Sequence, residues 1–325
     1  MKVIKSDPEN PGDELKEAAE IIKKGGLVAF PTETVYGLGA DALNERAVRR
    51  IFEVKGRPPD NPLIVHVCSI EEVYEIAEPN EVAEELMKRF FPGPLTVVVR
   101  NKRVPKVVTA GLDTVAVRMP DHKIALKLIE LSETPIAAPS ANKSGKPSPT
   151  KAEHVIEDFD DEIDCVIDGG ETKIGLESTV VDTTVYPIEI LRPGAVTKEE
   201  LEKYFDVRYA ESSAVARSPG MKYKHYAPEA ELIVLVGDNF EEKAFEIARE
   251  LERKGYRVGI AGMGLDCDNC YDLGRTLEDF ARNLFKALRE LDKRSDVIII
   301  QGVEEKGIGK AIMNRLKKAG RLYRI

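Results

Sequence analysis

The sequence predicts an α/β protein built from two domains. Short apolar strands alternate with amphipathic helical segments along nearly the whole chain, which is the pattern of α/β folds. The 325 residues are also more than one ordinary hydrophobic core holds. Residues 208–230 lack a clear period and contain two prolines. We therefore predict a first domain over residues 1–207, a linker over 208–230 and a smaller domain over 231–325.

Helices and strands of the first domain follow from periodicity and from end signals. Residues 13–26 are typical of an amphipathic helix that ends at two glycines, and residues 44–56 of a second helix with Asn44 as its N-cap. Thr197 and Glu200 form a capping box that predicts a short third helix. Apolar runs predict strands over residues 27–33, 62–67, 95–100, 114–119 and 135–140.

The second domain has the pattern of a small Rossmann-like fold. Its apolar runs predict strands over residues 231–237, 256–262 and 296–302. A helix follows each of them, and these helices are predicted from about residue 240, from Thr276 and over residues 307–319. Strands that alternate with helices in this way pair in parallel.

Charge and hydropathy exclude several kinds of protein. The formal net charge is -9, and the acidic excess lies in residues 1–230. An acidic surface binds nucleic acid poorly, so we expect no direct, stable binding of RNA. No apolar run reaches the about 18 residues of a membrane span, and the N-terminus lacks the apolar core of a signal peptide. We therefore expect a cytoplasmic protein without a membrane partner.

Cys267 and Cys270 form the C-x-x-C motif of the chain. A zinc site would need two further ligands at suitable spacing, and the neighbouring sequence offers none. A redox pair would be expected at a junction between a strand and a helix. The pattern favours a loop disulfide or inert thiols over a metal or redox site.

Two glycine-containing segments match phosphate-binding motifs only in part. Residues 307–311 follow a strand and open a helix, but the Walker spacing is incomplete and Ala311 stands where a Ser or Thr would bind magnesium. Residues 36–40 contain two glycines and lack the third of a dinucleotide fingerprint. We interpret both as ordinary turn and helix-start glycines.

Hydroxyl side chains follow the strand that ends at Pro31. Thr32, Thr34 and Tyr36 occupy alternate positions, and alternation along an extended chain would place their hydroxyls on one face. The alternative interpretation is a polar strand end without a function.

Two cations follow the second helix. Lys55 and Arg57 flank Gly56, and the prolines that come next stiffen the chain. A rigid loop with two cations and the amide of Asn61 suits a phosphate chain. A solvated basic helix end also explains Lys55 and Arg57. His66 lies within the following strand, where a lone histidine is usually packed and hydrogen-bonded.

Further polar residues mark three other strand ends. Residues 135–150 run from a strand into a loop rich in Ser, Gly and Pro, whose backbone N–H groups can approach an anion closely. An ordinary surface loop is the alternative. Arg118 and Arg192 end two apolar strands, and a buried strand end rarely carries an arginine without an anionic partner. The loop also carries Ser140, Asn142, Lys143, Ser144, Lys146 and Ser148.

Taken together, these motifs resemble the YrdC/YciO family. Lys55 and Arg57 match its K-x-R motif, Ser140 and Asn142 match its S-x-N motif, and PTETVYGLG precedes both. The segment SPGMKYKHYAP and the small α/β tail resemble the two-domain branch of the family. The resemblance therefore covers essentially the whole chain. It implies that the first domain is a twisted, mixed, strongly curved sheet that encloses a concave positive pocket.

The resemblance also implies a reaction. The family joins L-threonine, bicarbonate and ATP to give threonylcarbamoyl-AMP and pyrophosphate, with Mg²⁺ on the phosphates and few protein ligands to the metal. A separate transferase then passes the threonylcarbamoyl group to tRNA. A carbamate oxygen attacks the α-phosphorus, so this chemistry needs positioning and neutralisation of charge, and no covalent enzyme nucleophile.

Residue roles come with the resemblance. It implies that Lys55 and Arg57 are catalytic and that Arg118 pairs with the threonine carboxylate. The residues implied at the nucleotide end are Lys55, Arg57, Asn61, Thr114, Ser140, Asn142, Ser148, Arg192 and Tyr226. The residues implied at the threonine end are Thr34, His66, Arg118, Ala138 and Ser178.

Two other functions and one property of the linker stay open. A double-stranded-RNA-binding or regulatory protein is disfavoured by the acidic first domain, and a carbamoyltransferase acting on carbamoyl phosphate would need no nucleobase pocket. Residues 217–228 are rich in Lys, Tyr and His, unlike a passive tether. The resemblance favours a lid over the nucleotide in this segment, with Tyr226 nearest to the nucleotide. Packing of its aromatic residues on the domain surface is the alternative.

Overall fold

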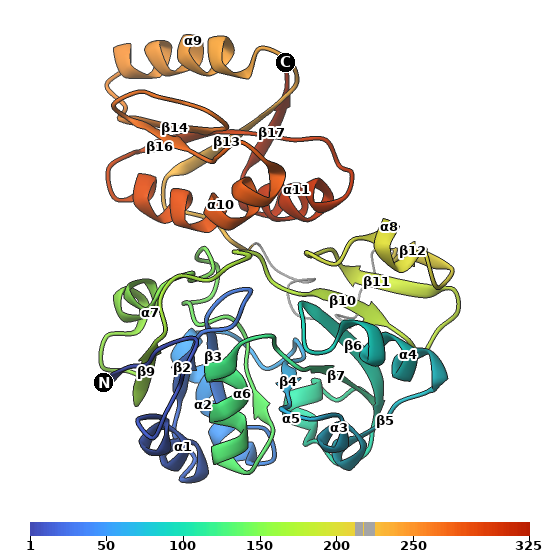
Figure 1. The fold of residues 1–325 in the computed structure, drawn as a ribbon. Coiled ribbons are helices and arrows are strands. Elements are labelled where there is room, and N and C mark those ends of the chain that lie inside the picture. The colour runs from blue at the N-terminus through green and yellow to red at the C-terminus, as the bar shows by residue number, and fades with distance from the viewer. Residues whose placement is uncertain (212–216, 218–224) are drawn as a thin grey trace. The chain divides into compact units, whose positions relative to one another are not determined.

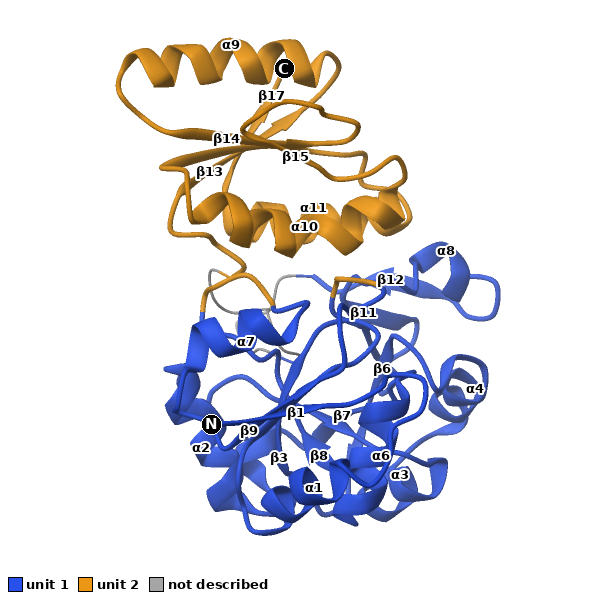
Figure 2. Cartoon of the chain, turned by 60° about the vertical axis from the view of Figure 1, so that its left-hand side comes forward, with its two compact units in different colours: residues 1–144, 149–173, 177–223 blue, residues 145–148, 174–176, 224–325 orange. Residues whose placement is uncertain are grey.

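The computed structural model describes residues 1–211, 217 and 225–325, which form two compact units (Figure 2). The first unit consists of residues 1–144, 149–173 and 177–223, and the second of residues 145–148, 174–176 and 224–325. Most of the expected lid, including Tyr223, therefore lies outside the described residues.

The first unit alternates strands and helices, as the sequence predicts (Figure 1). Its strands are β1 (Lys2–Lys5), β2 (Val28–Phe30), β3 (Gly37–Asp41), β4 (Ile64–His66), β5 (Ala77–Glu78), β6 (Leu95–Asn101), β7 (Thr114–Arg118), β8 (Ile136–Ala137), β9 (Cys165–Asp168), β10 (Thr179–Asp182), β11 (Ile188–Arg192) and β12 (Val207–Tyr209). Its helices are α1 (Leu15–Lys23), α2 (Glu45–Lys55), α3 (Ile70–Ile76), α4 (Glu81–Phe90), α5 (Lys106–Thr109), α6 (Lys123–Ser132), α7 (Ala152–Phe159) and α8 (Lys198–Leu201).

These strands form one twisted sheet of mixed direction, which confirms the predicted fold class of the first domain. The strand order is β1-β9-β2-β3-β8-β4-β7-β6-β10-β11-β12, and β5 pairs with β6. Strands β4 and β7 are parallel neighbours, whereas β8 and β6 run antiparallel on either side of them. Because β12 pairs with β11, Arg208 and Tyr209 belong to the sheet and not to the linker range 208–230.

The central strands bury two faces of different character. Their first face carries Val65, Val97 and Val117, which join helices α2 to α5 and α7 in the largest apolar core. Their second face carries Ile64, Val98 and Ala116, which belong to a much smaller apolar cluster. Polar side chains can therefore occupy the second face without disrupting the main core.

Local signals set the ends of several elements. The side chain of Asn44 accepts a hydrogen bond from the Ala47 N–H, 3.2 Å away, so Asn44 caps α2 as predicted. The capping box of Thr197 and Glu200 at α8 is confirmed as well. Strand β8 is shorter than the predicted strand 135–140, because prolines on both sides of it lack the N–H that a strand ladder requires.

Residues 37–40 are strand and not a turn, so the prediction of turn glycines there is wrong. Gly37 and Gly39 lie in β3. A Cβ at Gly39 would come within 2.8 Å of the Phe30 ring and 2.7 Å of Ile136. The glycine is required by close packing between neighbouring strands.

The second unit is a small parallel α/β fold, which confirms the predicted Rossmann-like domain. Its elements are β13 (Glu231–Val236), α9 (Phe240–Arg253), β14 (Val258–Gly262), β15 (Cys270–Asp272), α10 (Leu277–Asp292), β16 (Val297–Gln301), α11 (Ile308–Ala319) and β17 (Arg321–Arg324). All strand pairs are parallel, in the order β15-β14-β16-β13-β17. Helix α9 covers one face of this sheet, and α10 and α11 cover the other (Figure 1).

Cys267 and Cys270 are joined by a disulfide at the start of β15, in agreement with the favoured interpretation of the C-x-x-C motif. Within the described part of the chain, no group of three or more His, Cys, Asp or Glu residues could hold a metal ion. None of the helices built by the described residues is long and apolar enough to cross a membrane.

Candidate functional site

The register of the central strands aligns polar side chains on the second face of the sheet. His66 at the end of β4 pairs with Arg118 at the end of β7. Val97 of β6 pairs with Val117, so Thr96 comes next to Arg118 on the other side. Residues paired across neighbouring strands point to the same face. His66, Arg118 and Thr96 therefore form a buried row, each at most 4% exposed.

Arg118 has partners within the protein, but its Nη2 makes no hydrogen bond to a described residue. Its Nη1 donates a hydrogen bond to Thr34 Oγ1 at 3.0 Å, and its Nε donates to the Gly93 carbonyl at 3.3 Å. Its Nη2 lies 2.7 Å from Glu33 Oε1, which is an ion pair in a direction that makes no hydrogen bond. The anionic partner expected for a buried strand-end arginine is therefore present within the chain, and it is Glu33.

Sequence reasoning missed Glu33. It lies in the segment that supplied Thr32 and Thr34 as candidates, and it is 4% exposed. A carboxylate two residues beyond the apolar run 27–31 was a usable signal, because buried carboxylates are rare unless they are paired. Its partner Arg118 is 85 residues further along the chain, so the pairing itself could not be read from sequence.

The turn over residues 31–36 corrects the expectation for Thr32, Thr34 and Tyr36. Thr32 Oγ1 accepts hydrogen bonds from the N–H groups of Thr34 and Val35, so the segment is a turn and not an extended chain. The Thr32 and Thr34 hydroxyls meet at 2.8 Å as a result of this turn. The Tyr36 hydroxyl instead donates to the Gly170 carbonyl at 2.7 Å, so the three hydroxyls do not act together.

His66 is a buried, neutral imidazole beside Arg118. Burial, followed by the charge of Arg118, lowers the pKa of His66 to about 3. Its Nδ1 is buried and has no hydrogen-bond partner among residues 1–211, 217 and 225–325. A neutral imidazole nitrogen of this kind can serve a hydroxyl group of a ligand.

Ser178 and Arg192 extend the same region on the far side of Thr96. Ser178 Oγ lies 2.8 Å from Thr96 Oγ1 and accepts a hydrogen bond from Arg192 Nη2 at 3.1 Å. Arg192 Nε also donates to the Ser178 carbonyl at 3.0 Å. Arg192, which the resemblance assigns to the nucleotide, thus contacts a residue assigned to threonine. Ala138 follows β8 and donates its N–H to the Ile64 carbonyl at the start of β4.

The opposite ends of β4 and β7 gather the other candidates. Asn61 precedes β4 and Thr114 begins β7, whereas His66 and Arg118 end these strands. Four residue steps along β7 separate Thr114 from Arg118, which corresponds to about 13 Å. Because β8 runs antiparallel to β4, the residues that follow β8 come back to the start of β4, and Ser140 and Asn142 are among them.

Lys55 connects α2 to the loop after β8 by hydrogen bonds to two backbone carbonyls. Its Nζ donates to the Ser140 carbonyl at 2.6 Å and to the Asn142 carbonyl at 2.5 Å. It is 3% exposed, so the interpretation as a solvated helix end is wrong for Lys55. Burial, followed by the charge of Arg57, lowers the pKa of Lys55 well below its ordinary value. An anion bound nearby would offset the free-energy cost of burying the Lys55 ammonium.

Arg57 and Asn61 form the loop between α2 and β4. Arg57 Nη2 donates to the Asn61 carbonyl at 3.0 Å, and its guanidinium lies 5.3 Å from the centre of the Phe52 ring. The side-chain amide of Asn61 is 1% exposed, and both its nitrogen and its oxygen lack partners within the described ranges. Buried amides without partners are rare in native proteins, so the Asn61 amide keeps its hydrogen-bonding capacity for a further group.

Ser148 and Tyr226 belong to the second unit and are described with it. Ser148 is fully buried. Tyr226 is 5% exposed, and its ring stacks on Phe285 with centroids 5.4 Å apart and an interplanar angle of 27°. Arg315 lies 5.8 Å from the same ring. This arrangement matches the alternative in which an aromatic residue of the expected lid packs on a domain surface.

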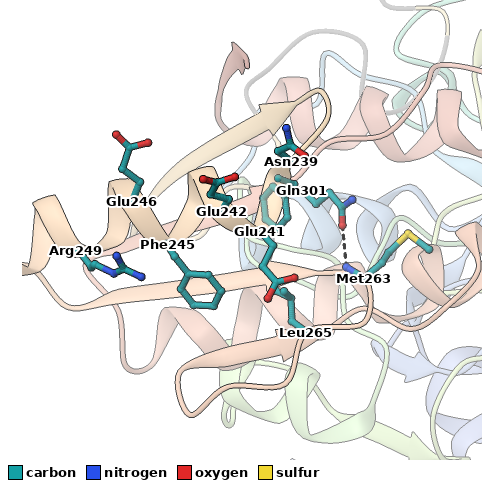
Figure 3. Close-up of a pocket in the computed structure, with 10 residues that line it drawn as sticks. Asn239, Glu241, Glu242, Phe245, Glu246, Arg249, Met263, Leu265 and Gln301 are labelled. Carbon is teal, nitrogen blue, oxygen red and sulfur yellow. Dashed lines mark hydrogen bonds between the residues drawn. The ribbon is translucent and has the colours of Figure 1, made fainter.

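The second unit also has an open cavity of about 800 Å³ along α9 as far as Arg249 (Figure 3). Its lining includes Glu241, Glu242 and Glu246, and Gln301 accepts a hydrogen bond from the Met263 N–H at 2.8 Å. Three carboxylates make this cavity unsuited to a polyphosphate. It contains none of the candidate residues predicted from sequence.

A mixed sheet with a buried polar row, joined to a small parallel α/β unit, defines the class of two-domain proteins with a YrdC-like domain. Residues 20–194 match the Sua5/YciO/YrdC family model, described as telomere recombination. Residues 196–320 match the model described as the C-terminal domain of threonylcarbamoyl-AMP synthase. The chain belongs to the two-domain threonylcarbamoyl-AMP synthase family.

Similar proteins cover the whole chain. The threonylcarbamoyl-AMP synthase of Pyrococcus abyssi is 58% identical over 323 residues, which are 96% of this chain and 95% of that protein. The Bacillus subtilis protein of the same name is 47% identical, with 96% and 94% covered. The crystal structure of P. abyssi Sua5 complexed with L-threonine superimposes with a TM-score of 0.95 at 54% identity, covering 100% of both chains.

Proposed function

We propose that this chain is an L-threonylcarbamoyladenylate synthase, a nucleotidyltransferase that makes threonylcarbamoyl-AMP from L-threonine, bicarbonate and ATP. The amine of threonine forms a bond to the carbon of bicarbonate, and water leaves. The resulting carbamate oxygen then forms a bond to the α-phosphorus of ATP, and pyrophosphate leaves.

The observation that carries the proposal is the buried pairing of His66 with Arg118 at the ends of β4 and β7. A guanidinium and a neutral imidazole side by side suit the carboxylate and the hydroxyl of threonine. Thr34 and Ser178 offer further hydroxyl groups around Arg118 and Thr96, and Ala138 bounds the region beside β4. The P. abyssi relative complexed with L-threonine supports this assignment.

The opposite ends of the strands are proposed to take the nucleotide. Lys55 and Arg57 supply positive charge to the phosphates, and they act as the catalytic cations because pyrophosphate carries away negative charge. The neutral hydrogen-bonding groups proposed there are those of Asn61, Thr114, Ser140, Asn142 and Ser148. Arg192 contacts Ser178 beside the proposed threonine site, and it is proposed to bind the nucleotide from there. Tyr226 is proposed to approach the nucleotide from the linker.

Mg²⁺ is proposed to enter with ATP as part of the substrate. The described residues offer no cluster of three or more His, Cys, Asp or Glu side chains for a resident metal. The phosphate oxygens of ATP are themselves preferred ligands of Mg²⁺.

The product is proposed to supply a separate transferase, which modifies an adenosine of tRNA. This chain itself needs no stable contact with tRNA, in keeping with its net charge of -9. The relatives' shared name, threonylcarbamoyl-AMP synthase, supports the identity of the product.

Release of pyrophosphate tests the proposal against its rivals. With ATP, Mg²⁺ and bicarbonate, we expect release that depends on added threonine. A carbamoyltransferase would instead require carbamoyl phosphate, and an RNA-binding protein would release no pyrophosphate. Release that is equal with and without threonine would contradict the proposed reaction.

A further inference from the structure

Glu33 is a buried carboxylate whose hydrogen-bonding capacity is unused. It is 4% exposed, and neither of its side-chain oxygens accepts a hydrogen bond from a residue that the structure describes. Leaving a buried carboxylate without donors costs several kcal/mol by the usual order of magnitude. The position of Glu33 therefore points to a donor that a ligand brings.

The ion pair with Arg118 does not satisfy Glu33. A carboxylate whose role is only to neutralise an arginine usually takes two parallel hydrogen bonds from it. Here Oε1 alone lies close, 2.7 Å from Arg118 Nη2, in a direction that makes no hydrogen bond. His122 is another titratable group near Glu33, but burial lowers the pKa of His122 to about 4, so it is not a cation at neutral pH.

The chemistry of an α-amino acid explains this arrangement. Its carboxylate and its ammonium group are attached to the same carbon atom, so the residues that bind them must be neighbours. Arg118 is suited to the carboxylate, and Glu33 lies directly beside Arg118. An ammonium group has three N–H donors, which can serve the two oxygens of Glu33.

We propose that Glu33 binds the α-ammonium group of the amino-acid substrate and so determines specificity for amino acids over deaminated analogues. This inference rests on the proposed function, since threonine is the ligand that it requires. Holding the nitrogen also positions the atom that forms the bond to the carbon of bicarbonate once the ammonium group has lost a proton to solvent.

Calorimetric titration of the full-length protein without ATP tests the inference with two ligands. L-Threonine carries the ammonium group, and (R)-3-hydroxybutyrate has a hydrogen in its place and the same configuration at the hydroxyl carbon. We expect Glu33→Gln to weaken threonine binding at least thirtyfold, about 2 kcal/mol, and to change 3-hydroxybutyrate binding less than threefold. Glu189→Gln is the matched control, because Glu189 is a buried carboxylate paired with Arg208 and Arg217 at the far end of β11.

Each other outcome overturns the inference in a recognisable way. Equal weakening of both ligands would mean that Glu33 only holds Arg118 in place. Tighter binding of both would mean that Glu33 only competes with the substrate carboxylate. If Glu33→Gln does not fold, Glu33→Asp keeps the charge, and it must still prefer threonine to 3-hydroxybutyrate by at least tenfold. Failure of the wild-type protein to bind threonine would contradict the proposed function instead.

Discussion

The two ends of β4 and β7 hold their polar residues in different ways. At the ends of these strands, strand register places His66 and Arg118 side by side, and the side chains of Thr34 and Glu33 contact Arg118. At the beginnings of β4 and β7, loops supply most of the residues, and backbone carbonyls accept hydrogen bonds from the Lys55 ammonium. Register fixes positions firmly, so the first arrangement suits selection of one small amino acid. Loops adapt more easily, which suits a polyphosphate that changes during the reaction.

Substitution of Arg118 is expected to have the largest effect. Arg118→Gln removes the partner of the substrate carboxylate and leaves Glu33 buried without its cation. We expect threonine affinity to fall at least three-hundredfold, and the free energy of unfolding to fall by about 3 kcal/mol. Calorimetry and thermal unfolding measure both. Arg208→Gln is the control, because Arg208 is exposed and Glu189 keeps its second partner Arg217, so the loss is expected to be at most about 1 kcal/mol. Near-normal threonine binding by Arg118→Gln would contradict the assignment.

Replacement of the threonine hydroxyl is expected to have the next largest effect. Valine puts a methyl group where His66 or Thr34 would bond an oxygen, so we expect it to bind about a hundredfold more weakly. Serine keeps the hydroxyl and loses one methyl, which costs on the order of 1 kcal/mol. Competition titration against threonine measures both ratios. Equal affinities for valine and threonine would rule out a hydroxyl-binding pocket at this end.

Substitution of Lys55 tests whether the two ends of β4 and β7 bind their substrates independently. Lys55→Met is expected to lower the rate of adenylate formation at least tenfold, about 1.4 kcal/mol, while threonine affinity without ATP changes less than twofold. Pyrophosphate release and calorimetry give the two values. Lys127→Met, an exposed lysine on α6 paired with Glu130, is the control and should change neither. A parallel loss of threonine binding in Lys55→Met would show that the two ends are not separate.

The pH dependence of stability gives the smallest effect. The pKa of His66 is about 3 in the folded protein, whereas an unfolded histidine titrates near its ordinary value of 6.5. Between these values the unfolded chain binds more protons, so stability is lost as pH falls from about 6.5 towards 3. We expect about 1 kcal/mol of this loss between pH 6 and pH 5 to come from His66. Denaturant unfolding of His66→Leu should show a free energy of unfolding that falls less steeply with falling pH than in the wild-type protein. An unchanged slope would mean that His66 is not a buried, neutral imidazole.

Much of the fold was readable from sequence because its signals are local. Each of these signals lies within a few residues of the element that it predicts. Examples are Asn44, the capping box at Thr197 and the strand–helix alternation of residues 231–325. The short β8 and the strand identity of Gly39 were missed, because proline neighbours and contacts across the sheet decided them.

The site was readable only in part, because strand register decides it. Sequence placed His66 within one strand and Arg118 at the end of another, but not opposite each other. It also treated Lys55 as a solvated or phosphate-facing cation, whereas its partners are carbonyls 85 and 87 residues away. Contacts at such separations depend on the order of the strands, and that order cannot be derived from the composition of any one strand.

Mass spectrometry of the reaction products tests the central claim most directly. The protein would be incubated with ATP, Mg²⁺, ¹³C-labelled bicarbonate and L-threonine. The account predicts a threonine-containing adenylate that carries the ¹³C label, formed together with pyrophosphate and absent when threonine is left out. An adenylate without the label, a carbamoyl-adenylate formed without threonine, or no adenylate at all would contradict it.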